Sequence, residues 1–118
     1  MSRTARTLFV WGFYLLGLGV ALVVVPNLLL ALFGIAPTEE VWIRVIGVLV
    51  LILAYFAYSA ARQEVRDYFR WSVPARAAVP IFFAIFVLLN LAPAQLILFG
   101  LVDLAAAAWT WQTLRSEG

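Results

Sequence analysis

Four long stretches of the chain are almost wholly apolar, and most charged residues lie between them. The stretches cover residues 7–25, 41–61, 73–91 and 94–111. Each is close to the roughly 20 residues that an α-helix needs to cross about 30 Å of hydrocarbon. Residues 49–53 are all Leu, Val or Ile, without the alternation of a membrane β-strand. The pattern predicts an all-α, integral membrane four-helix bundle, with residues 1–118 as one transmembrane domain.

The composition supports a membrane protein and narrows its chemistry. Of 118 residues, 66% are hydrophobic and 12% are charged, whereas a soluble domain carries about 25% charged residues. The chain has no Cys and no His. Their absence removes thiol chemistry, the commonest metal ligand and the usual proton shuttle near neutral pH. We therefore expect no enzymatic activity, no metal site and no cofactor.

The eight cations are all Arg, and seven of them fall on one side of the predicted bundle. The seven are Arg3, Arg6, Arg62, Arg66, Arg70, Arg76 and Arg115. The connectors over residues 34–40 and 90–93 contain no cation. By the positive-inside rule, both termini and the connector over residues 62–72 are cytoplasmic. The net charge of +2 is explained by this topology, so we expect no nucleic-acid partner.

Pro26 marks the end of the first span. Pro disfavours helical geometry at the residue before it, and residues 7–25 already supply about 28 Å of helix. Residues 27–33 are apolar and precede Gly34 at a C-cap position. We predict a short apolar helix there, at the outer face; one long, kinked span is the alternative. The apolar run is too long for a cleaved signal peptide.

The second helix has start signals in the sequence. Thr38 can serve as its N-cap, and Glu39 and Glu40 then occupy the first turn, where negative charge suits the helix dipole. The third helix is expected to open at Ser72 and Pro74, because Pro is best tolerated in the first turn.

Beyond its membrane part, the second helix is predicted to continue into the cytoplasmic connector. Arg62, Arg66 and Arg70 recur every four residues, which would place them in one stripe along a helix. Such a stripe can contact anionic lipid headgroups. An ordinary positive-inside connector is the alternative.

Two charges fall inside the predicted spans, Arg44 and Asp103. An acid in the hydrocarbon costs at least about 2.5 kcal/mol, so it needs a partner, a proton or a function. Asp103 shares a helix face with Gly100, Ala107 and other small residues, which favour close helix contacts. We predict that Arg44 and Asp103 pair, directly or through water, and hold the second and fourth spans together.

Alternatives remain for each charge. Arg44 can instead reach outward to Glu40, four residues earlier. Asp103 can stay protonated and hydrogen-bond to Tyr14, to Thr110 or to a backbone carbonyl.

The outer half of the predicted bundle also holds several uncharged polar residues. Asn27, Asn90 and Gln95 could line a polar vestibule together with Glu40 and Arg44. Amides at helix ends more often serve as caps, which is the alternative for all three.

Residues 26–47 carry a resemblance to a known family. The run from Pro26 through Phe33 and Gly34, followed by Arg44 and Gly47, resembles the DoxX-like group of small bacterial four-helix membrane proteins. The resemblance implies a four-helix bundle in the bacterial cytoplasmic membrane. It implies no catalytic residue, because these families are mostly uncharacterised.

Two hypotheses for function follow from the sequence. In the first, the chain is a non-enzymatic accessory or structural protein, a homodimer or a subunit of a membrane complex, stabilised by the Arg44–Asp103 pair. In the second, the same pair lines a pocket that binds or transports a small polar or amphipathic ligand.

Overall fold

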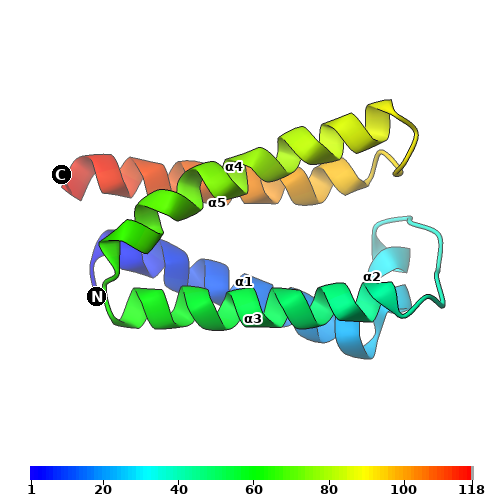
Figure 1. The fold of residues 1–118 in the computed structure, drawn as a ribbon, viewed down its shortest axis with the longest axis horizontal. Helices are drawn as coiled ribbons and strands as arrows, with labels where there is room; N and C mark the ends of the chain where they lie inside the picture. The colour runs from blue at the N-terminus through cyan, green and yellow to red at the C-terminus, as the bar shows by residue number, and fades with distance from the viewer. Residues whose placement is uncertain (118) are drawn as a thin grey trace.

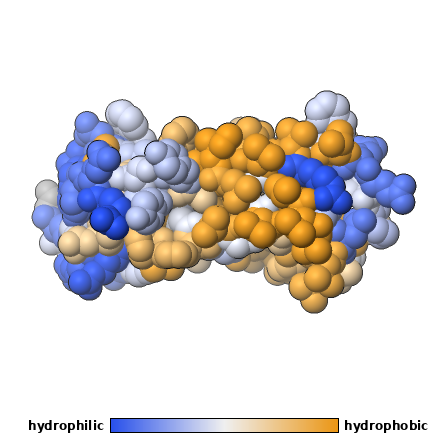
Figure 2. Space-filling view, turned by 90° about the horizontal axis from the view of Figure 1, so that it is seen from below, coloured by the Kyte–Doolittle hydropathy of each residue, from blue (hydrophilic) through white to orange (hydrophobic). Residues whose placement is uncertain are grey.

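The computed structural model describes residues 1–117, which form five α-helices and no strand. The helices are α1 (Arg3–Val24), α2 (Pro26–Leu32), α3 (Trp42–Arg62), α4 (Arg66–Leu88) and α5 (Leu96–Glu117). All but α2 are long and apolar enough to cross a membrane. Figure 2 shows the matching surface, an apolar band between two hydrophilic ends. The predicted all-α bundle with four apolar helices is confirmed.

The four long helices form two antiparallel pairs. In the first hairpin α1 packs along α3, and in the second hairpin α4 packs along α5 (Figure 1). The hairpins meet mainly through α1 and α5, whereas α3 and α5 do not pack together. The start of α1, the α3–α4 junction and the end of α5 lie at one end, here called the closed end. The opposite end, with α2 and the α4–α5 turn, is called the open end.

Glycine allows close approach within each hairpin. A Cβ added at Gly47 of α3 would lie 2.9 Å from Leu22 Cβ and 3.0 Å from Val23 N of α1. A Cβ added at Gly100 of α5 would lie 2.9 Å from Pro80 Cα of α4. The two distances of 2.9 Å are shorter than real Cβ atoms show, so the helices approach closely at these points, as small residues in membrane helices permit.

The first span and the short helix are separate elements. Helix α1 ends at Val24, and Val25 has non-helical angles of φ −133° and ψ 59°. Pro26 then occupies the first position of α2, where its missing N–H costs nothing. The structure thus contains the predicted short helix, and the alternative of one long kinked span is wrong.

The predicted continuation of the second helix past Arg62 is also wrong. Helix α3 ends at Arg62 and α4 begins at Arg66, seven residues before the expected start of the third span. Between them Glu64 adopts a positive φ of 54°, an uncommon conformation for a residue with a side chain. Val65 N donates to Ala60 O at 3.0 Å and closes the turn.

Helix α4 therefore carries two prolines in its interior, Pro74 and Pro80. The prediction that Pro74 lies in the opening turn is wrong. Pro cannot donate to the carbonyl four residues earlier, so those two backbone bonds are missing from α4. Neighbouring helices and side chains make such interior prolines tolerable in membrane helices.

The contact between Gly100 and Pro80 gives a stability prediction. We expect Gly100→Val to force α4 and α5 apart and to lower the free energy of unfolding by about 1–3 kcal/mol. Gly17→Val is the matched control, because nothing lies within 4 Å of a Cβ added at Gly17. Thermal unfolding in detergent, followed by circular dichroism, measures both. Equal losses for the two variants would contradict the close contact.

Candidate functional site

The buried polar side chains gather in the half of the bundle near the closed end. Arg76 of α4 is only 6% exposed, and Thr7 of α1 and Thr110 of α5 are at most 1% exposed. With Ser72 and Trp11 they form one contact group, here called the Arg76 cluster. It joins three of the four long helices.

The guanidinium of Arg76 is held by oxygen atoms from two helices. Its Nη2 donates to Thr110 Oγ1 at 2.8 Å and to Ser72 Oγ at 3.0 Å. Its Nε donates to Ser72 O at 3.3 Å. The guanidinium carbon also lies 5.2 Å from the centroid of the Trp11 ring, a cation–π contact. The positive charge is therefore solvated by the protein without a carboxylate in contact.

Thr110 also connects the Arg76 guanidinium to α1. Its Oγ1 lies 2.8 Å from Thr7 Oγ1, and Thr7 also donates to Thr4 O at 2.7 Å. The Nη1 nitrogen of Arg76, with its two N–H donors, remains unused, because it is buried and has no hydrogen-bond partner among residues 1–117.

Asp103 lies on α5, two turns before Thr110 and on a similar face. Its side chain is half-buried and close enough to interact electrostatically with both Arg76 and Tyr14. Tyr14 stacks on Trp11, with the ring centroids 5.1 Å apart. The described residues include no hydrogen bond from Asp103 to Tyr14 or Thr110, so these predicted bonds are not formed. Arg76 is a cation whose charge acts on Asp103.

The predicted direct pair between Arg44 and Asp103 is wrong. Within residues 1–117 no ion pair joins them, and their helices do not pack together. Arg44 instead donates through Nη1 to Val23 O. Helix α1 ends at Val24, which leaves the carbonyls of its last turn without intrahelical partners. A cation at that position satisfies one carbonyl and suits the negative end of the helix dipole.

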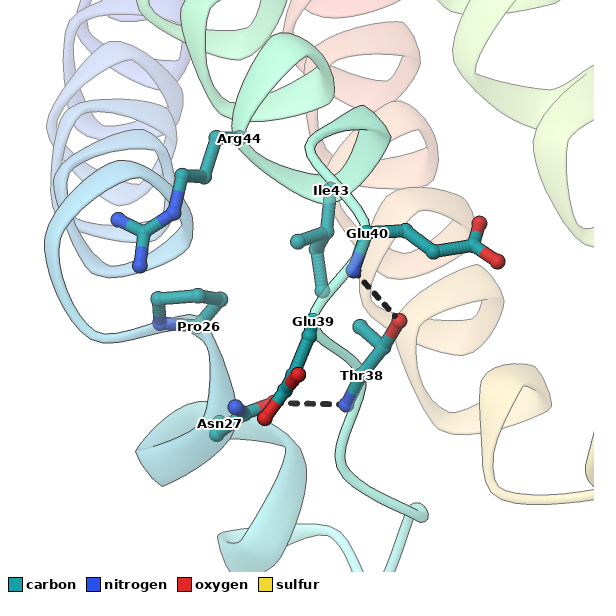
Figure 3. Close-up of a pocket in the computed structure, with 7 residues that line it drawn as sticks. All are labelled: Pro26, Asn27, Thr38, Glu39, Glu40, Ile43 and Arg44. Carbon is teal, nitrogen blue, oxygen red and sulfur yellow. Dashed lines mark hydrogen bonds between the residues drawn. The ribbon is translucent and has the colours of Figure 1, made fainter.

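The polar residues predicted to line a vestibule come together only in part. Asn27, Glu40 and Arg44 line a pocket of about 160 Å³ at the open end (Figure 3). Asn27 Oδ1 accepts a hydrogen bond from Thr38 N at 2.9 Å, which fixes the loop before α3. Glu40 makes no ion pair with Arg44 in the described chain, so that alternative is not formed either.

Thr38 and Asn90 build turns. Helix α3 begins at Trp42, and Thr38 Oγ1 accepts from Glu40 N at 3.2 Å, so Thr38 is not the N-cap. Asn90 follows α4 with a positive φ of 60° and does not line the pocket. Leu91 N donates to Phe86 O at 2.8 Å, which places Asn90 in a helix-terminating turn.

The three arginines of the predicted stripe each have a partner inside the protein. Arg62 Nη1 donates to Tyr58 Oη at 3.2 Å, and Arg70 Nη1 donates to Asp67 at 3.0 Å. Arg66 Nη1 lies 2.8 Å from Glu117 Oε2. The break after Arg62 puts that residue on a different helix from the other two, so no single stripe exists.

Acidic side chains tie the closed end together. Glu117 accepts from Thr4 N at 2.9 Å as well as from Arg66, which connects α1, α4 and α5. Glu64 accepts from Ser2 N at 2.7 Å and from Ser2 Oγ at 3.0 Å. Burial alone would raise the pKa of Glu64, but the bonds from Ser2 and the charge of Arg66 lower it below its ordinary value of 4.5. These contacts offset the cost of the positive φ at Glu64.

The charge pattern groups Arg76 with the arginines of the cytoplasmic side, although Arg76 lies inside the predicted span of residues 73–91. That position was the signal that could have identified it as a third intramembrane charge. Its spacing of four residues from Ser72 also allowed the side-chain contact seen in the structure.

The arrangement offers few routes to chemistry. Residues 1–117 contain no group of three Asp and Glu side chains that could hold a metal ion. The Thr110 hydroxyl lies 3.1 Å from Ala106 O and accepts from a guanidinium, with no base beside it to activate it. The oxygen atoms of the cluster accept hydrogen bonds from the positively charged Arg76 guanidinium.

Comparisons with known proteins do not add to this description. No family model, no curated protein and no solved structure matches the chain. The resemblance to the DoxX-like group therefore stays a prediction.

Arg44 bonds to Val23 O and not to Asp103, which predicts that the two residues contribute to stability independently. We expect the stability losses of Arg44→Gln and Asp103→Asn to add within about 0.5 kcal/mol in the double variant. Thermal unfolding of the four proteins in one detergent completes the cycle. A larger coupling energy would restore the pair that the structure separates.

The contact of Glu64 with Ser2 predicts a dependence of stability on pH. Because the folded pKa lies below 4.5, ionised Glu64 stabilises the fold above that pH, and this contribution is lost as the pH falls through the folded pKa. We expect the wild type to unfold at a higher temperature than Glu64→Gln at pH 7. The two unfolding temperatures should converge toward pH 3, and a constant difference would argue against the prediction.

Proposed function

We propose that this chain is a non-enzymatic membrane protein, an accessory subunit or small scaffold, in which the Arg76 cluster holds the two helix hairpins together. The observation that carries the proposal is the nearly complete burial of Arg76 between three helices. This clamp replaces the Arg44–Asp103 pair expected from the sequence.

The contacts of the cluster support a structural role. Arg76 donates to Thr110 of its own hairpin, and Thr110 contacts Thr7 of the other hairpin. Trp11, also from the other hairpin, covers the guanidinium. Hydrogen bonds to a charged group each contribute about 1.5–3 kcal/mol, and cation–π contacts about 2 kcal/mol when desolvated. Together they favour docking of α1 on the α4–α5 hairpin.

The setting of the protein is part of the proposal. The six arginines at the closed end other than Arg76 support a cytoplasmic location for that end and for both termini. The DoxX-like resemblance supports the bacterial cytoplasmic membrane. A second copy of the chain or a larger membrane protein would be the partner.

A second function has one specific observation in its favour. Arg76 Nη1 is buried without a partner, and Asp103 and Tyr14 lie near the same cluster. A small amphipathic ligand with a carboxylate or phosphate could satisfy that donor. In this case Arg76 is retained for binding, and the fold tolerates its loss.

Replacing Arg76 separates the two functions. If the cluster is a clamp, we expect Arg76→Met, which keeps most of the volume, to lower the free energy of unfolding by about 2 kcal/mol. Arg70→Met is the matched control, because it removes the same charge from an exposed position of the same helix. Thermal unfolding in detergent measures both. Unchanged or increased stability of Arg76→Met would reject the clamp and favour the ligand site.

A double-mutant cycle tests the connection between Arg76 and Thr110. Thr110→Val removes the shared hydroxyl at nearly constant shape, so under the clamp the two losses should not add, with a coupling of about 0.5–3 kcal/mol.

A further inference from the structure

A second cavity lies at the closed end, between the first turns of α1 and the last turns of α5. Its volume is about 350 Å³, within the range of small-ligand sites. It is lined by Arg3, Arg6, Trp109, Gln112, Thr113 and Ser116. None of these residues belongs to the Arg76 cluster.

The cavity carries positive charge that the protein does not fully neutralise. In the described chain the Arg6 guanidinium has no ion pair and no hydrogen bond, and Arg6 is exposed. Arg3 lies 4.0 Å from Glu117 Oε1, but its side chain is 64% exposed. Glu117 already accepts from Arg66 and Thr4. Arg3, Arg6 and Arg66 carry three positive charges and Glu117 carries one negative charge, which leaves a net charge of two beside the cavity.

The uncharged lining suits the boundary between lipid and water. Thr113 and Ser116 donate to carbonyls of their own helix. Among the uncharged residues of the lining, this leaves the Gln112 amide and the Trp109 indole as donors without a partner in the described chain. Trp is enriched at headgroup level because its ring is apolar with one polar N–H. The lining thus combines a neutral amide donor with an amphipathic ring.

An exposed apolar surface continues from the cavity toward the open end. On α1, Val10 and Phe13 follow Arg6 at spacings of four and seven residues, on the same face, and both are exposed. On α5, Val102 and Leu98 lie seven and eleven residues before Trp109 and are also exposed. A molecule with its anionic group at Arg3 and Arg6 can therefore lay hydrocarbon chains along both helices.

We propose that this cavity binds the phosphate group of an anionic membrane lipid. Arg3 and Arg6 hold the phosphate oxygens, since the guanidinium fork matches phosphate geometry. Gln112 adds a neutral donor, and the acyl chains follow the apolar faces of α1 and α5. The site differs from the predicted contacts at Arg62, Arg66 and Arg70, whose guanidinium groups are already engaged. It does not depend on the Arg76 clamp.

Lipid titration of the purified full chain tests the site. Native mass spectrometry in detergent would measure the dissociation constants of phosphatidylglycerol and phosphatidylcholine. We expect the double variant Arg3→Gln/Arg6→Gln to bind phosphatidylglycerol about 30-fold more weakly, with phosphatidylcholine unchanged. The matched control Arg62→Gln/Arg70→Gln removes the same charge at the same end and should stay near wild type. Equal weakening in both double variants would show a diffuse charge effect and overturn the proposal.

Two further arms keep the result interpretable. Gln112→Leu removes the neutral donor of the cavity without changing any charge, and we expect weaker phosphatidylglycerol binding at an unchanged unfolding temperature. Normal binding by this variant would overturn the cavity as the site, even if the arginine variant fails to fold. Millimolar inorganic phosphate should not displace phosphatidylglycerol from the wild type. Displacement would assign the site to free anions and overturn the lipid assignment.

Discussion

The buried guanidinium of Arg76 is the constraint on which the arrangement of the helices depends. A guanidinium removed from water must donate its hydrogen bonds to acceptors of the protein, because the surrounding hydrocarbon offers none. Ser72 and Thr110 can accept these bonds, and Trp11 can cover the guanidinium, only if α1, α4 and α5 hold one particular register. The hairpins therefore meet near Arg76, while the opposite end of the bundle is free of such a requirement.

The helical spans could be predicted because they depend on a property summed over many residues. The hydropathy of a stretch of about 20 residues changes little with a few exceptions, so the third span could be predicted despite Pro74 and Pro80 in its interior. The helix boundaries depend on single contacts. The break after Arg62 is supported by Ser2, 62 residues away from Glu64 in sequence, and no local pattern around Arg62 contains that information.

The polar site was predicted only in part, for a similar reason. Asp103 was recognised as an inward-facing acid because small residues share its face. Its partner was assigned by the rule that charges in membranes pair, which says nothing about geometry. In the structure Arg44 donates to the carbonyl of Val23 at the end of α1, and no carboxylate of the described residues forms an ion pair with it. Arg76 was not recognised because the charge count grouped it with the arginines of the cytoplasmic side, although the hydropathy pattern placed it in a span.

The pairing of consecutive spans has a consequence for how the protein is made. Helices α1 and α3 are neighbours in the order of spans, and so are α4 and α5, so each hairpin can form from local contacts as it leaves the insertion machinery. Only the docking of one hairpin on the other joins distant parts of the chain. Arg76 and Thr110 already bond to each other within the second hairpin. The last step of assembly within the bilayer therefore adds the contacts from α1, Thr7 to Thr110 and Trp11 over the Arg76 guanidinium.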